Sequence, residues 1–363
     1  MLAIDSLLAG GAQRQIVMLA NELADRGFEV TLVTYSPGDQ LSATLSRRVA
    51  LRFVRRRGKL GLGYMVGLFK LFRLLQPRAV IAFLSTPCFY ARLVGRLARV
   101  PIVITSVRNS NYFPESAEMR LERLLWRLSD YVVVNSRQSA TQLVSGGVPE
   151  SRVKLIRNGL DSVHFQRADQ GAIDQLRADL GIAQSELFVL LPGRIQRQKN
   201  HRLLVDACLE LPPGRWAWKV GFAGNLLDDA IVTSLKAVIK RAGAEEKFLF
   251  LGPRSDMPTL YSAADVVVLP SLWEGFPNVL LEAMSCGAPV VCSDVGDNSI
   301  IVPDDRFGST FPSGDREALA TAIGNILGAS RRDRVRIGDA GRRFVRGSFS
   351  AASMADQFIT LID

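Results

Sequence analysis

The sequence predicts an α/β protein of two domains, each built around a parallel β-sheet. Short apolar runs rich in β-branched residues recur along the 363 residues, with helical segments between them. Continuous apolar runs such as residues 265–270 are typical of parallel strands covered on both faces. A turn cluster at residues 157–161 lies between two such series. We therefore expect one domain at residues 1–165, a second at residues 166–345 and a final helix at residues 346–363.

Composition indicates a reduced, cytoplasmic protein. No apolar run reaches the roughly 18 residues that a membrane-spanning helix needs. The first residues lack the basic region of a signal peptide, and an acidic residue follows at Asp5. The cysteines show neither metal nor disulfide spacing, so we expect reduced core residues. They are Cys88, Cys208, Cys286 and Cys292.

The net charge of +10 is unevenly distributed. Residues 1–168 hold 24 Lys and Arg against 11 Asp and Glu, whereas the remainder holds 21 against 24. A basic first half and a nearly neutral second half indicate domains with different partners. An anionic membrane, an anionic acceptor or a nucleic acid would each suit the first half.

The stretch that follows residues 265–270 carries the most specific pattern. It predicts a loop and then a short helix, with Asn278 as the N-cap and Gly287 as the helix stop. Glu282 then falls at the fourth helical position, and Glu274 lies in the loop before the helix. A helix N-terminus suits a phosphate, while carboxylates accept hydrogen bonds from hydroxyl groups. Phosphate with hydroxyls on both sides describes a sugar nucleotide.

This stretch, Glu-Gly-Phe-Pro-Asn-Val-Leu-Leu-Glu-Ala-Met, resembles the paired-glutamate signature of retaining GT4 glycosyltransferases, which have the GT-B fold. The resemblance implies two Rossmann-like domains with parallel sheets facing a central cleft. It implies that the first domain binds the acceptor, that the second binds the nucleotide sugar, and that the last helix crosses back to the first domain. It covers nearly the whole chain and is strongest over residues 187–292.

The resemblance extends to Arg194 and Lys199, which match the family's Gly-Arg…Lys element. That element binds the donor diphosphate, and its two cations stabilise the charge that grows on the leaving phosphate without a metal. Glu282 should then hold ribose hydroxyls, and Glu274 a hydroxyl of the transferred sugar. Further donor contacts are expected from the loop and from two strand ends: Gly275, Phe276, Pro277, Asn278, Gly224 and Pro253.

In the first half, the glycine pair Gly10-Gly11 follows the first strand and is similar to the family's glycine-rich first loop. Arg108 and Asn109 follow the strand at residues 101–106, at an edge where open α/β sheets bind ligands. Many GT4 enzymes carry a histidine near this point, but the histidines of this chain lie elsewhere, at 164 and 201. Arg108 or Asn109 is therefore expected to take that place.

Basic residues crowd residues 47–59, and an apolar stretch with two cations follows at residues 60–75. One interpretation is a solvated basic face on a core helix. The other is a surface that lies on an anionic membrane, where each basic residue contributes roughly 1 kcal/mol. Nucleic acid is disfavoured because no aromatic residues alternate with the arginines.

The resemblance thus implies a metal-independent retaining glycosyltransferase of the hexosyltransferase type, with no cofactor. It would move a sugar from a nucleotide sugar, a UDP-sugar, to a glycan or lipid-linked acceptor of a surface-polysaccharide pathway. It would act in the cytoplasm or at the cytoplasmic face of the membrane. No second carboxylate is evident as a covalent nucleophile, which favours same-face attack. The alternatives are a non-catalytic module that binds nucleotide sugar or anionic lipid, and a nucleotide-sugar epimerase or phosphorylase of the same fold.

Overall fold

The computed structural model describes residues 1–58, 61–108, 122 and 124–363, which form two compact units. The first unit comprises residues 1–159 and 351–363, and the second comprises residues 160–350. The expected boundaries at 165 and 345 thus differ from the observed division by a few residues. The final helix, α14 (Ala351–Ile362), belongs to the first unit, where it packs on α1 (Gly11–Asp25).

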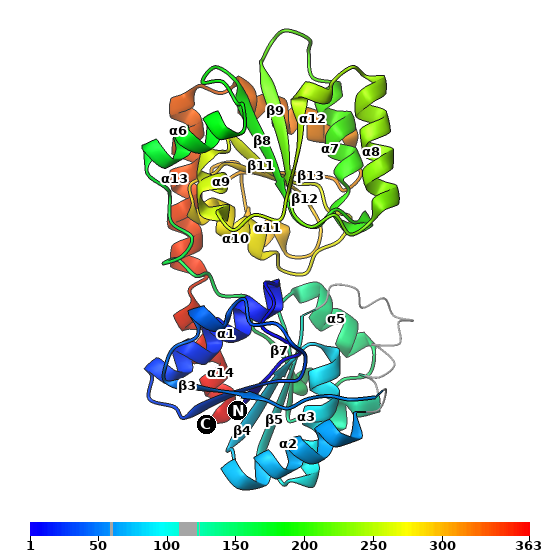
Figure 1. The fold of residues 1–363 in the computed structure, drawn as a ribbon, viewed down its shortest axis with the longest axis vertical. Coiled ribbons are helices and arrows are strands. Elements are labelled where there is room, and N and C mark those ends of the chain that lie inside the picture. Colours follow the sequence, from blue (N-terminus) through cyan, green and yellow to red (C-terminus); the bar gives the residue numbers. More distant parts are fainter. Residues whose placement is uncertain (59–60, 109–121, 123) are drawn as a thin grey trace. The chain divides into compact units, whose positions relative to one another are not determined.

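The sheet of the first unit has the strand order β3-β2-β1-β4-β5-β6-β7, and every neighbouring pair is parallel (Figure 1). Its strands are β1 (Leu2–Ala3), β2 (Val30–Thr34), β3 (Val49–Phe53), β4 (Ala79–Phe83), β5 (Ile102–Val107), β6 (Tyr131–Val134) and β7 (Val153–Leu155). The edge strand β3 lies inside the basic run, where the sequence did not predict a strand.

Helices cover both faces of this sheet, which explains its continuous apolar strands. On one face α1 and α14 pack against side chains such as Ile81 and Phe83. On the other, α2 (Leu62–Leu75) and α3 (Ser85–Leu97) pack against alternating residues such as Val80 and Ala82. The helix α5 (Arg137–Ser145) covers β6.

The second unit repeats the plan with the strand order β10-β9-β8-β11-β12-β13, again parallel throughout. Its strands are β8 (Leu187–Pro192), β9 (Trp218–Ala223), β10 (Phe248–Gly252), β11 (Val266–Leu269), β12 (Val290–Ser293) and β13 (Ser309–Phe311). Two βαβαβ halves that meet at a reversal of strand order define the Rossmann-like arrangement. Both units therefore place their ligand-binding edge at the carboxyl ends of their strands.

The helices of the second unit divide between the two faces of its sheet. One face carries α7 (His201–Leu209), α8 (Asp229–Arg241) and α12 (Arg316–Gly328). The other carries α6 (Gln170–Asp179), α9 (Met257–Ala263), α10 (Asn278–Ser285), α13 (Arg331–Ser348) and the short α11 (Asn298–Ile301). All four cysteines are free and buried, as predicted. None of the described helices combines the length and apolar character needed to span a bilayer.

Candidate active site

Two predicted residues of opposite charge meet at the carboxyl edge of the second sheet. Lys199 ends a short turn after β8, and Glu274 lies in the loop after β11; the two strands are hydrogen-bonded neighbours. Lys199 Nζ lies 2.5 Å from Glu274 Oε1, and both side chains are largely buried. Ser271 Oγ donates to the same oxygen at 2.7 Å. The sequence predicted each charge, but not that they pair or that Ser271 joins them.

The backbone around this pair is held by close approaches. Gln198 fixes the loop after β11 through two hydrogen bonds of 2.8 Å. Its side-chain Nε2 donates to the Trp273 carbonyl, and its backbone carbonyl accepts from Leu272 N. Gly296, in the loop after β12, lies against the Glu274 carbonyl, and a Cβ at this glycine would come within 2.2 Å of that oxygen. The Glu274 loop therefore rests on the next loop of the sheet.

Helix α10 begins one residue earlier than predicted. Pro277 is the N-cap and Asn278 is the first helical residue, so the prediction of Asn278 as N-cap was wrong. The fixed φ of proline suits a helix start, which leaves Asn278 inside the first turn. Glu282 is consequently the fifth helical residue, not the fourth. Gly287 stops the helix with a φ of 82°, as predicted.

Glu282 is held by a residue that the sequence did not single out. Tyr261, on α9, donates its hydroxyl to Glu282 Oε2 at 2.9 Å. The ring of Tyr261 is buried in the core of the second unit. Only the packing of α9 against α10 brings the two together, so no local sequence signal would have revealed the contact.

The other predicted donor residues lie around these groups in different settings. Arg194 follows β8 with an exposed side chain, and Pro253 is exposed after β10. Gly224 has a packing reason of its own, because a Cβ there would come within 2.1 Å of the Gly193 carbonyl oxygen. Phe276 is buried and its ring packs edge-on against Phe349. Its side chain is therefore part of the core, and a donor contact from this residue would have to come from its backbone. Gly275 and Pro277 are buried as well.

His201 directly follows this region but is a core residue. Its ring packs edge-on against Phe222, with centroids 5.3 Å apart. Burial, and to a lesser extent the charge of Lys199, lowers the pKa of His201 to about 3. Within the described part of the chain, neither ring nitrogen has a hydrogen-bond partner. This setting makes His201 a packing residue rather than an acid or base.

The predicted residues of the first half belong to the first unit. Gly10 caps the start of α1 and Gly11 is its first residue. In the first turn of this helix, Gln13 Nε2 donates to Asp5 Oδ1 at 3.0 Å. Arg108 follows β5 directly. Asn109 lies outside the described residues. The prediction that Arg108 or Asn109 takes the place of the family histidine stays a prediction.

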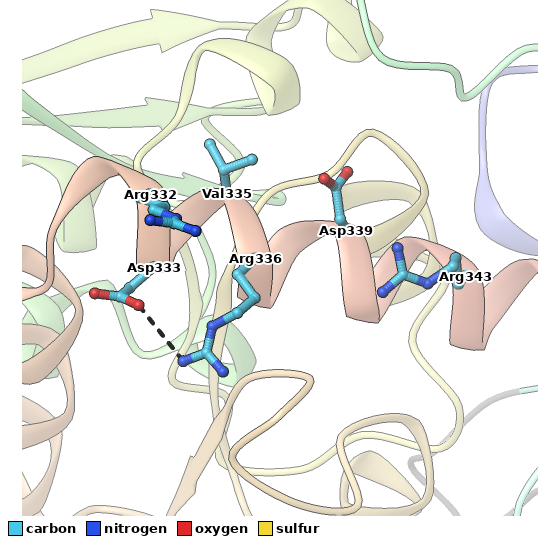
Figure 2. Close-up of a pocket in the computed structure, with 6 residues that line it drawn as sticks. All are labelled: Arg332, Asp333, Val335, Arg336, Asp339 and Arg343. Carbon is cyan, nitrogen blue, oxygen red and sulfur yellow. Dashed lines mark ion pairs between the residues drawn. The ribbon is translucent and has the colours of Figure 1, made fainter.

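A hollow of about 650 Å³ lies away from these groups, beside the exposed face of α13 (Figure 2). It is lined by Arg332, Asp333, Val335, Arg336, Asp339 and Arg343. Arg336 and Asp333 form an ion pair at 3.5 Å. Every lining residue comes from one helix, and none is a predicted site residue.

Comparison with known families accounts for both units. A family model described as glycosyl transferases group 1 matches residues 172–344, and one described as glycosyltransferase family 4 matches residues 9–163. The chain belongs to the GT4-type glycosyltransferases. This GT4-type chain is 36% identical over 202 residues to D-inositol 3-phosphate glycosyltransferase of Mycobacteroides abscessus, which covers 55% of the chain and 44% of the relative.

A second relative, the lipopolysaccharide core biosynthesis mannosyltransferase LpsB of Rhizobium meliloti, is 32% identical over 209 residues, or 56% of the chain and 57% of LpsB. The GT4-type chain thus spans about half the length of these curated relatives.

Solved structures show the same fold over nearly the whole chain. Anabaena HepE in complex with UDP and glucose matches with a TM-score of 0.88 and 22% identity, covering 99% of this chain and 97% of HepE. Sucrose-phosphate synthase from Thermosynechococcus elongatus matches with a TM-score of 0.81 and 23% identity, again over 99% and 97%. The GT4-type chain therefore has the GT-B fold, as predicted.

Proposed function

We propose that the protein is a retaining glycosyltransferase that moves a sugar from a UDP-sugar to a glycan or lipid-linked acceptor. The observation that carries this proposal is the Lys199–Glu274 pair at the carboxyl edge of the second sheet. It puts a cation for a phosphate and a carboxylate for a sugar hydroxyl within one hydrogen bond of each other, just before α10. The relatives named as glycosyltransferases, and the UDP and glucose bound to HepE, support the same substrate class.

In this proposal, different residues of the second unit bind different parts of the donor. Arg194 and Lys199 neutralise the diphosphate as the bond from its oxygen to the anomeric carbon breaks. Glu274 accepts a hydrogen bond from a hydroxyl of the transferred sugar, and Glu282 holds the ribose hydroxyls. The acceptor oxygen attacks from the face that the phosphate leaves, and its proton passes to the departing phosphate oxygen. No metal is needed, because fixed cations meet the developing charge.

A thermal-shift panel tests the donor class. UDP, GDP, ADP and their common sugars would be added to wild type, to Glu282→Ala and to a matched control, Glu317→Ala, which removes an exposed carboxylate on α12. A ligand at one hundred times its dissociation constant stabilises the native state by about 2.7 kcal/mol. We expect UDP to raise the melting temperature of wild type and of the control, with or without EDTA, but not of Glu282→Ala.

Product analysis then separates the alternatives. Transfer to an acceptor, or slow hydrolysis of the UDP-sugar, supports a transferase. An epimerised sugar nucleotide would indicate the epimerase, and nucleotide binding without turnover in the presence of acceptor extracts would indicate a binding module. An adduct of the sugar on an enzyme side chain would contradict same-face attack.

We also propose that the first unit rests on an anionic membrane through α2. Tyr64, Leu68 and Phe72 point into the core, whereas the opposite side of the helix exposes Leu62 and Val66 by 64% and 55%. The exposed side also carries Lys70 and Arg73, and Arg52, Arg55 and Arg57, which precede the helix in the chain, are exposed as well. An exposed apolar stripe with basic neighbours suits an anionic lipid surface.

Cosedimentation with vesicles tests this surface. We expect binding to phosphatidylglycerol vesicles, weaker binding to phosphatidylcholine and loss of binding in Val66→Asp. Leu97→Asp, an equivalent change at an exposed leucine on α3, is the control and should bind like wild type. Equal binding by Val66→Asp and wild type would rule out α2 as the contact.

A further inference from the structure

Arg108 occupies an unusual environment at the carboxyl end of β5 in the first unit. Its Nε donates to Ser106 Oγ at 2.9 Å, and its Nη1 donates to Asn158 Oδ1. Its guanidinium carbon lies 4.2 Å from the centroid of the Phe83 ring. The remaining nitrogen, Nη2, is buried and has no hydrogen-bond partner among the residues that the structure describes. The guanidinium is thus held on two sides while part of its donor capacity is unused.

The partners of this guanidinium are all neutral. Among the residues that the structure describes, no carboxylate forms an ion pair with Arg108. Burial lowers the pKa of Arg108 to about 9, so the group is still charged at neutral pH. The side chain as a whole is half-buried, but the desolvation of its buried guanidinium nitrogen is costly without a counter-charge. The group that this environment lacks is an anion.

The backbone next to Arg108 is strained. Leu84, which follows the Phe83 that contacts the guanidinium, has a φ of 73°. A positive φ is unfavourable for a branched side chain. Leu84 N donates to the carbonyl of Ser106, so the strained residue is tied to the residue that orients Arg108. Such strain is concentrated at ligand-binding sites, where the surroundings enforce it.

The position in the sheet also favours a ligand. The order of strands reverses between β1 and β4, and β5 is the next strand along. Open α/β sheets bind ligands outside the carboxyl ends of the strands at such a reversal. Arg108, Ser106 and Asn158 all lie at that edge, on or after β5 and β7.

We propose that Arg108, oriented by Ser106 and Asn158, forms a subsite for a phosphate group of a substrate. A planar guanidinium offers paired N–H groups that match a phosphate, which a lysine cannot do. This inference rests on the proposed function, whose substrates supply two sources of phosphate. One is an acceptor that carries a phosphate, and the other is the diphosphate of the donor.

Ligand titration of three variants tests the subsite. Inorganic phosphate, glucose 6-phosphate, neutral glucose and UDP would be titrated at constant ionic strength into wild type, Arg108→Gln and Arg108→Lys. Arg241→Gln, which removes an exposed arginine on α8, is the control for net charge. We expect wild type and control to bind glucose 6-phosphate and phosphate but not glucose. Arg108→Gln should bind both ligands at least about tenfold more weakly, as the loss of a hydrogen bond to a charged group predicts.

The two sources of phosphate give different results. If Arg108→Gln weakens glucose 6-phosphate binding and leaves UDP binding within twofold, the subsite serves the acceptor. If it weakens UDP binding instead, the subsite serves the donor diphosphate. If Arg108→Gln binds glucose 6-phosphate and UDP as wild type does, the inference is overturned. It is also overturned if wild type binds neither phosphate nor glucose 6-phosphate and Arg108→Gln binds UDP normally. Failure of UDP to bind wild type would count against the proposed function itself.

A purely structural role for Arg108 predicts a different pattern. It predicts that Arg108→Gln lowers the melting temperature of the ligand-free protein, whereas an uncompensated cation predicts a melting temperature that is equal or higher. Arg108→Lys keeps the charge without the planar fork, so it reports on binding even if the glutamine variant does not fold. Phosphate binding by Arg108→Lys at wild-type strength would overturn the inference.

Discussion

Tyr261 orients Glu282 through a single hydrogen bond, and this contact predicts how nucleotide binding depends on a residue outside the signature. Tyr261→Phe keeps the buried ring but removes the donor to Glu282 Oε2. A hydrogen bond of this kind is worth about 0.5–1.5 kcal/mol, so we expect UDP affinity to fall about threefold to tenfold. Calorimetric titration measures the change, with Tyr131→Phe as control. An unchanged affinity would show that Glu282 needs no such support.

His201 makes stability depend on pH in a defined direction. Its pKa of about 3 lies below the ordinary 6.5, so at pH 5 the unfolded chain binds a proton that the native state does not. The free energy of unfolding therefore falls as the pH decreases from about 7 toward 3. From pH 7.5 to pH 5, His201 should account for about 2 kcal/mol of this loss.

Urea unfolding at the two pH values measures this effect. His201→Phe should lose about 2 kcal/mol less than wild type over that pH range. His164→Phe, at the other histidine, should behave like wild type. An identical loss in His201→Phe and wild type would contradict a neutral buried imidazole.

Sequence reasoning located the charged residues of the site but not their contacts. Glu274 and Lys199 stand out by residue type and spacing, yet they are 75 positions apart. Their pairing depends on β8 and β11 becoming neighbours, which is a property of the sheet and not of either segment. The prediction of the N-cap of α10 was wrong because both Pro277 and Asn278 suit a helix start. Local propensity does not choose between them.

At the scale of elements, the close packing of α13 on α10 depends on one glycine. A Cβ at Gly338 would come within 2.0 Å of the carbonyl oxygen of Gly287, which ends α10. Gly338→Ala should therefore push the helices apart and lower the free energy of unfolding by about 1–3 kcal/mol, as overpacking does. It should also weaken UDP binding, because α10 carries Glu282.

The same helix offers a matched control. Gly347, in the last turn of α13, has open space around its Cβ position and no positive φ. Gly347→Ala should raise the free energy of unfolding by about 0.5–1 kcal/mol, since alanine favours the helix. Equal effects of the two substitutions in chemical denaturation would contradict the close contact.

Elements with continuous apolar runs were the predictable part of the fold. Covered on both faces, strands such as β8 and β11 need no polar residues, so their pattern is plain in the sequence. The edge strand β3 lacks this pattern, because one of its five residues is buried and the others face solvent. Its arginines therefore predicted a basic surface segment and not a strand.

At the scale of the whole molecule, the last helix completes the core of the first unit. Met354, Ala355, Phe358 and Ile362 of α14 are buried there. Each larger side chain contributes about 1.5–3 kcal/mol on burial, and their sum is comparable to the 5–15 kcal/mol by which a typical domain is stable. Truncation after Ser350 should therefore unfold the first unit, while UDP still stabilises the second.

Scanning calorimetry with and without UDP would show this as loss of one transition and retention of a UDP-sensitive one. Removal of Asp363 alone, which is exposed, should leave both unchanged. A truncated chain that melts like the full-length protein would contradict the role of α14.

The buried thiols make the protein well suited to spectroscopic labelling. Burial raises the pKa of Cys88, Cys208 and Cys286 to about 12, and it raises that of Cys292 as well. Thiols in such surroundings are protonated and inaccessible, so maleimide dyes should react slowly with all four. A cysteine introduced on the surface of each unit would then label selectively in the native background. Energy transfer between two such dyes would follow the separation of the units as nucleotide binds.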